Sequence, residues 1–257
     1  MAAAEQMTAE RNRASPPAVY VYGVTRSGIG LRRLKGLADA SVDLVEHGEL
    51  AAIVSDAPPG QLRAKRRDVL RHTEVLQRAL ENETVLPLAF GIVFASRTSV
   101  VDDLLVARYE ELVELMHRFD ALIELTVRAF YREDAVLAEI VREDRAISEL
   151  REATQTGAVS EAARVRLGEA VAQQLEARRA RDADALLARL LPLAGDVVVE
   201  ERRAEYEVLR ASFLVDRHAL ERFDTRMQEL AREQDERMLF KYTGPLAPHS
   251  FVSLRGA

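Results

Sequence analysis

Cysteine is absent from the 257-residue chain. Its absence excludes disulfides, thiolate zinc sites, iron–sulfur clusters and a thiol nucleophile. Long apolar runs are missing as well. No stretch reaches the about 18 apolar residues that a membrane-spanning helix needs, so we expect no membrane partner. Residues 1–17 are rich in Ala, Glu, Arg, Ser and Pro and have no apolar centre. They predict a disordered tail, not a secretory signal, and the default location is the cytoplasm.

A surplus of basic residues is also missing. The chain has 36 Lys and Arg against 42 Asp and Glu, which gives a net charge of −6. An acidic balance argues against a general nucleic-acid binder, although a local basic patch is still possible. Hydrophobic residues make up 48% and charged residues 30%, the mixture of a soluble globular protein with a real core. The length allows one large domain or two small ones.

The first half of the chain alternates between strand and helix patterns. Runs of β-branched and apolar residues predict three strands, the last two forming a hairpin, at 18–24, 42–46 and 50–55. Apolar residues at helical spacing predict a helix over 62–82 and another that starts at Ser99 as N-cap and ends near Arg118. Residues 85–94 contain Pro87 and Gly91, which predicts an edge strand, a bulge or a bent strand.

The second half begins with the clearest alternation in the sequence, over residues 123–131, so we place a domain boundary near Ala121. The elements expected after it are a helix at 133–151, a long helix at 160–191, strands at 196–201 and 205–216, a helix at 217–234 and a strand at 237–243. The predicted fold class is therefore α+β, with two domains at 18–120 and 121–257. The second domain is expected to be a ferredoxin-like antiparallel sheet with a helical insertion at about 133–191.

The long helix is longer than a small domain needs. Its simple interpretation is a helical hairpin that partly projects and has a solvated, mixed-charge outer face. The alternative interpretation is an arm that grips a partner helix.

Motifs for chemistry are mostly missing. The loop Gly23–Gly30 lacks the Lys and Ser or Thr of a phosphate-binding loop, and Gly28 and Gly30 supply only the first pair of a dinucleotide fingerprint. No two histidines have the spacing of a paired helical ligand, so His72 and the others are expected at the surface or in caps. No Gly-x-Ser-x-Gly nucleophile elbow is present. We therefore predict no catalytic, cofactor-binding or metal-binding residues and no enzyme activity.

Two tyrosines on the first strand support a rival hypothesis. Tyr20 and Tyr22 resemble the stacking aromatics of RNA-recognition domains, but the second signature of those domains is missing. The rival is a ligand- or RNA-binding module on a ferredoxin-like scaffold, although the charge balance makes a nucleic-acid partner unexpected.

Three stretches together resemble the gas vesicle protein F/L family. They are Tyr20-Val21-Tyr22-Gly23-Val24, then His72-Thr73-Glu74-Val75-Leu76 leading into residues 85–94, and finally residues 244–252. The resemblance runs from about residue 18 to 254. The chain departs from the family at Ala89, where members often have a basic residue, and at Pro248-His249, where many have Pro-Tyr.

The resemblance implies a non-enzymatic minor component that is needed to build gas vesicles, the protein-walled buoyancy compartments of some prokaryotes. It implies two α+β domains with ferredoxin-like features, a cytoplasmic and gas vesicle location, and no cofactor. The partners it implies are the small hydrophobic shell protein and accessory gas vesicle proteins. A soluble partner can cover an aggregation-prone shell surface by strand addition or by a helix laid in a groove, and both modes remain open.

The candidate partner-binding residues lie in the middle and closing stretches. They are Leu86, Pro87, Leu88, Phe90, Gly91, Gly244, Pro245, Ser250 and Phe251. The alternative is that the Pro and Gly residues shape turns while the apolar side chains, Leu88, Phe90 and Phe251 above all, pack inside.

Overall fold

The computed structural model describes residues 17–31, 34–60, 62–155, 161–252 and 254. All but the last residue of the expected disordered tail, 1–17, therefore lies outside the described residues. The chain divides into two compact units, Met1–Glu124 with Pro245–Ala257, and Leu125–Gly244. We call them unit 1 and unit 2. This division differs from the expected one in the last residues, which return to unit 1 because Ala247, Val252 and Leu254 are buried there. The domain assignment itself stays a prediction.

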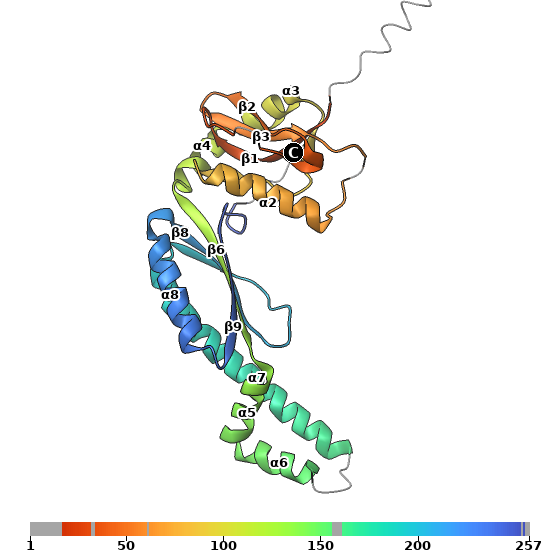
Figure 1. The fold of residues 1–257 in the computed structure, drawn as a ribbon, viewed down its shortest axis with the longest axis vertical. Helices are drawn as coiled ribbons and strands as arrows, with labels where there is room; N and C mark the ends of the chain where they lie inside the picture. Colours follow the sequence, from red (N-terminus) through yellow and green to blue (C-terminus); the bar gives the residue numbers. More distant parts are fainter. Residues whose placement is uncertain (1–16, 32–33, 61, 156–160, 253, 255–257) are drawn as a thin grey trace, which may run out of the picture. The chain divides into compact units, whose positions relative to one another are not determined.

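Unit 1 is built on an antiparallel sheet in the order β2-β3-β1-β4, with β5 also paired to β1. Figure 1 shows β2, β3 and β1 of this sheet. Its strands are β1 Val19–Arg26, β2 Asp43–His47, β3 Leu50–Asp56, β4 Val85–Pro87 and β5 Val93–Phe94. Strand β1 is buried along nearly its whole length. At Gly23 a Cβ would lie 2.7 Å from the Leu86 carbonyl oxygen, so only glycine permits this approach of β1 to β4.

The segment 85–94 is an interrupted strand, as Pro87 and Gly91 suggested. Pro87 is the last residue of β4, and Gly91 has a φ of 101°, in the left-handed region that favours glycine. The chain then rejoins β1 as β5. Two pieces of one sequence motif thus border the same central strand.

The helices of unit 1 differ in detail from those expected. They are the 3-10 turn η1 Leu37–Asp39, α2 Arg66–Leu80, α3 Arg97–Val100, the π-helical turn η2 Val101–Val106 and α4 Tyr109–Arg118. The prediction of Ser99 as the N-cap is wrong. The hydroxyl of Ser96 accepts a hydrogen bond from the Ser99 amide, so the helical region starts three residues earlier.

Unit 2 has a four-stranded sheet in the order β7-β8-β6-β9. Its strands are β6 Leu122–Tyr131, β7 Asp196–Val199, β8 Glu207–Asp216 and β9 Met238–Leu246. Strands β7 and β8 are antiparallel, and the predicted α+β class with two sheets is confirmed. Helix α8 Leu220–Glu233 packs Phe223 against Phe213 of β8, with ring centroids 5.4 Å apart. The ferredoxin-like assignment stays a prediction.

The helical insertion contains three helices within the described residues, α5 Glu133–Glu143, α6 Arg145–Gln155 and α7 Glu161–Leu190. The helix expected over 133–151 is interrupted at Asp144, whose backbone is extended. Its carboxylate accepts a hydrogen bond from the Ile147 amide at 3.2 Å and so caps α6. We call these three helices the arm. Helix α7 contacts both β8 and α8, which joins the arm to the sheet of unit 2.

Candidate functional site

The candidate site of unit 1 is the place where the end of the chain meets the middle motif. We call residues 245–252 and 254 the closing segment. Leu254 forms a parallel β-bridge with Leu88, directly after β4. Both side chains are buried. The middle and closing stretches of the sequence therefore come together, although more than 150 residues separate them.

A buried carboxylate anchors the closing segment. Glu124, at the start of β6, is only 3% exposed. It accepts two hydrogen bonds from Ser250, one from the amide at 2.7 Å and one from the hydroxyl at 2.8 Å. A buried charge is costly unless hydrogen bonds compensate it. Ser250 supplies that compensation, so the closing segment and the buried carboxylate stabilise each other.

Beside this anchor lies an aromatic cluster around His72 of α2. The Nδ1 atom of His72 is 2.8 Å from the Tyr20 hydroxyl, which also accepts a hydrogen bond from the Gly91 amide at 3.1 Å. A tyrosine hydroxyl can accept two hydrogen bonds and donate one, so either tautomer of the neutral imidazole can pair with Tyr20 through Nδ1. The imidazole also packs against the rings of Tyr22 and Phe90.

Burial keeps His72 neutral. The side chain is 2% exposed, and the imidazole of His249, from the closing segment, lies 6.3 Å away between ring centroids. Burial, and to a smaller degree the charge of His249, lower the pKa of His72 to about 4. The cluster is thus built for an uncharged imidazole.

The lowered pKa of His72 predicts that acid destabilises unit 1. Between pH 6.5 and about 4 the unfolded chain binds a proton at this position before the folded chain does, so stability falls as the pH falls. The loss at pH 4 relative to neutral pH is about 3 kcal/mol. Urea unfolding of a His72→Gln variant should show a flatter pH dependence over this range. The exposed His47→Gln variant should keep the wild-type slope, and equal slopes for all three proteins would contradict the assignment.

The predicted site residues fall into three groups by burial. Leu86, Pro87 and Leu88 are buried, Phe90 and Phe251 are half-buried, and the exposed members are Gly91, Gly244, Pro245 and Ser250. Burial of the leucines fits the packing alternative. Gly244 lies in β9, in unit 2, whereas the others belong to unit 1. A role for any of them in binding a partner stays a prediction.

The burial of Tyr20, Tyr22 and His72 differs most from what the sequence predicts. Tyr20 and Tyr22 are both fully buried, so neither offers a face to a base. The Tyr22 hydroxyl accepts a hydrogen bond from the Leu37 amide at 2.8 Å. The prediction of a surface or capping His72 is wrong because α2 covers β1. The near-continuous apolar run in β1 is the signal for a strand covered on both faces.

The glycine loop after β1 carries no sign of phosphate binding. The Gly28 amide donates to the carboxylate of Glu46 at 3.2 Å. A carboxylate at this position would repel an anionic ligand. The loop is better explained as a turn, in which Gly28 has a φ of 83°.

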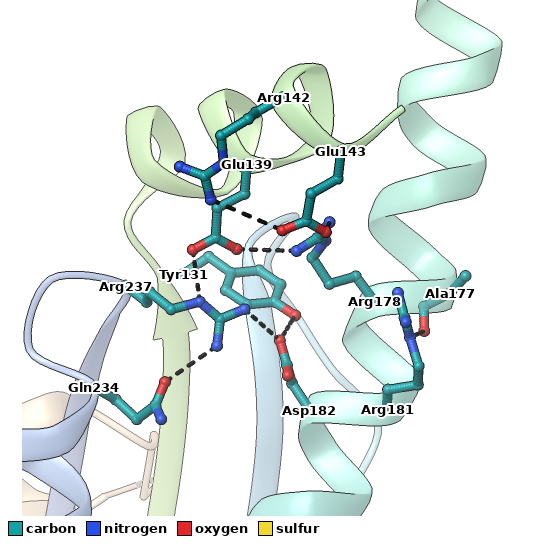
Figure 2. A network of polar contacts seen from close by, with 10 residues as sticks. All are labelled: Tyr131, Glu139, Arg142, Glu143, Ala177, Arg178, Arg181, Asp182, Gln234 and Arg237. Atoms are coloured by element: carbon teal, nitrogen blue, oxygen red, sulfur yellow. Dashed lines mark hydrogen bonds and ion pairs between the residues drawn. The ribbon is translucent and has the colours of Figure 1, made fainter. Parts of the chain in front are cut away.

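A second polar cluster joins the arm to the rest of unit 2 (Figure 2). Arg178 of α7 donates to Glu139 at 3.0 Å and to Glu143 at 2.6 Å, both on α5. Arg237, just before β9, donates to Glu139 at 2.7 Å and to Asp182 at 2.9 Å. We call these five residues the arm-root network.

Tyr131, the last residue of β6, completes the connection. Its hydroxyl donates to Asp182 at 2.6 Å, and burial together with this carboxylate raises the pKa of Tyr131 (Figure 2). Because the hydroxyl stays protonated, it stays a donor. The arm-root network therefore ties two arm helices to a strand end and to the segment before β9.

Metal-binding and membrane-spanning features are both missing from the described part of the chain. It contains no group of three or more His, Asp or Glu side chains placed to hold a metal ion. None of its helices is both long and apolar enough to span a membrane.

Comparisons with known proteins identify the family. The family model described as "Gas vesicle synthesis protein GvpL/GvpF" matches residues 18–253. Gas vesicle protein F of Streptomyces sp. (strain CB03234) is 32% identical over 240 residues, covering 91% of this chain and 98% of that protein. Gas vesicle protein F of Nostoc sp. (strain PCC 7120) is 25% identical over 239 residues, covering 92% and 98%.

Two crystal structures have the same fold. The gas vesicle protein GvpF from Anabaena sp. PCC7120 superposes with a TM-score of 0.80 at 24% identity, covering 93% of this chain and 99% of that one. GvpF from Microcystis aeruginosa superposes with a TM-score of 0.75 at 20% identity, covering 92% and 99%. The resemblance predicted from three short stretches is confirmed over nearly the whole sequence, and the chain belongs to the gas vesicle synthesis protein GvpL/GvpF family.

Proposed function

We propose that this chain is a non-enzymatic assembly factor that acts in the cytoplasm and at the gas vesicle, where it binds the hydrophobic shell protein and other accessory gas vesicle proteins. The observation that carries the proposal is the family match over residues 18–253. Physical chemistry makes the role reasonable, because a shell protein with a water-averse face aggregates unless a partner covers that face before assembly.

The surface that we propose for the shell protein lies beside the candidate site, at β5. Among the described residues β5 pairs only with β1, and its Val93 is 42% exposed. A hollow of about 610 Å³ borders it, lined by residues 91–95 together with Ser99, Asp103 and Ala107. An unpaired strand edge with an exposed valine suits strand addition by an extended segment of a client, and the adjoining hollow is lined by both apolar and polar residues. This observation favours strand addition for unit 1.

Deleting the gene from a complete gas vesicle cluster should abolish or deform vesicles, and the wild-type gene should restore them. Complementation with a Val93→Asp variant should fail, because an apolar client that covers the strand edge would have to desolvate the added carboxylate. Capture of shell protein by this variant should be lost at an unchanged melting temperature. Val165→Asp, a similarly exposed site in unit 2, is the matched control and should complement. Normal vesicles in the deletion strain would overturn the proposal.

The rival RNA-binding function has less support, because Tyr20 and Tyr22 have no free ring faces. Titration with short RNA should show no tight, salt-sensitive binding.

A further inference from the structure

The arm contains an open groove that the described chain does not fill. Its volume is about 660 Å³, and helices α5, α6 and α7 all contribute to it. The apolar lining residues of α5 and α7 are Leu137, Ala138, Val141, Leu167 and Val171. None of the five is fully buried, although all five carry aliphatic side chains. The arm thus presents apolar surface along a concave face.

Gly168 lies in this groove, well inside the 30-residue helix α7. Glycine weakens the interior of a helix relative to alanine, so it calls for a reason. Packing within the described chain gives none, because a Cβ built at Gly168 would meet nothing within 4 Å. A missing side chain in a groove allows another backbone to approach closely. The described chain gives no packing reason for a glycine here, whereas a second backbone lying in the groove gives one.

Two arginines give the groove its charge. Arg151 of α6 and Arg164 of α7 both line it, together with one acid, Asp134. Within the described ranges no ion pair holds the side chain of either arginine. Elsewhere on the arm, Arg178 and Arg145 are paired with glutamates, whereas Arg166 and Arg181 donate to backbone carbonyls. Two unpaired cations beside apolar walls complement an occupant that carries carboxylates next to an apolar face.

We propose that the groove binds an amphipathic α-helix of another gas vesicle protein, with its apolar face toward Gly168 and acidic side chains toward Arg151 and Arg164. The proposal rests on the proposed function only for the source of that helix. A helix fits better than a strand, because the groove is walled by helix sides and offers no free sheet edge. A second copy fits less well, because its own groove carries the same two unpaired arginines.

The test uses two synthetic helical peptides with the same leucine face, one with glutamates flanking that face and one with lysines. Binding to the full chain is followed by fluorescence anisotropy. The glutamate peptide should bind at least about tenfold more tightly than the lysine peptide. The double variant Arg151→Glu with Arg164→Glu should reverse this preference. Equal binding of the two peptides, or no binding of either, would overturn the proposal.

The Gly168→Leu variant tests the groove by filling it with a side chain. It should abolish peptide binding while the melting temperature stays equal or rises, because leucine favours a helix. Ala162→Leu, an exposed position outside the groove and on a different face of α7 from Gly168, is the matched control and should bind like wild type. Unchanged peptide binding by Gly168→Leu would overturn the proposal. Dimerisation of the wild-type chain through this face at raised concentration would also overturn it.

Capture of shell protein by the Gly168→Leu variant should persist. If the wild-type chain binds neither peptide but still captures shell protein, only the groove proposal is overturned. If the wild-type chain does not capture shell protein, the proposed function is overturned.

Discussion

Ending the chain after Gly244 should lower the free energy of unfolding of unit 1 by about 5 kcal/mol. Two losses add up in this variant. The carboxylate of Glu124 loses both hydrogen bonds from Ser250. The burial of Val252 and Leu254 is lost as well, and each buried aliphatic side chain contributes about 1.5–3 kcal/mol. The loss is comparable to the total stability of a small domain.

Hydrogen exchange of β1 and β4 and urea unfolding measure this effect. The variant Ser250→Ala keeps the backbone amide donor and removes only the hydroxyl. It should lower the free energy of unfolding by about 2 kcal/mol. Thr243→Ala, an exposed position of β9, is the control and should stay within about 0.5 kcal/mol of wild type. If the shortened chain keeps the wild-type protection of β1 and β4, the closing segment is not an integral part of unit 1.

Replacing Arg178 with methionine should destabilise unit 2 by about 3 kcal/mol. The side chains of Arg178 and Glu139 are only 10% and 14% exposed, so removal of the arginine leaves a poorly solvated carboxylate with Arg237 as its remaining partner. Removing one member of a buried ion pair costs more than replacing both members with apolar groups. The double variant Arg178→Met with Glu139→Met should therefore recover much of the loss.

Urea unfolding of the single and double variants gives the coupling between the two residues. Arg181→Met is the matched control, because Arg181 is exposed on the same helix and its guanidinium donates only to the Ala177 carbonyl, at 3.4 Å, in the described structure. Hydrogen exchange should show faster opening of α5 and α7 in Arg178→Met than in the control. A double variant that is less stable than Arg178→Met would contradict the role given to the arm-root network.

Local patterns predicted most of the elements but not the contacts that make the site. Alternation located β6, and helical periodicity located α7, because each signal is contained within its own segment. The helix break at Asp144 was missed because the apolar periodicity continues on both sides of it, so only the side-chain cap on Ile147 marks the new start. The Ser96 cap was missed for a similar reason, since Ser99 is an equally good capping residue.

The site itself depends on pairings between distant residues. Glu124 and Ser250 are 126 positions apart, and Tyr20 and His72 are 52 apart. No period or spacing connects such residues, because the sheet and the return of the chain end bring them together. The middle and closing stretches could be identified from the sequence, and the bridge between Leu88 and Leu254 explains why these two of the three stretches form one place in the fold.

Co-purification is the direct measurement of whether this chain binds the wall subunit of the gas vesicle. The tagged full-length chain is isolated from cells that express a complete gas vesicle cluster, and the bound proteins are identified by mass spectrometry. We expect the shell protein to be retained by the wild-type chain and lost from Val93→Asp. Recovery of the chain free of shell protein, from cells that are actively building vesicles, would contradict the account.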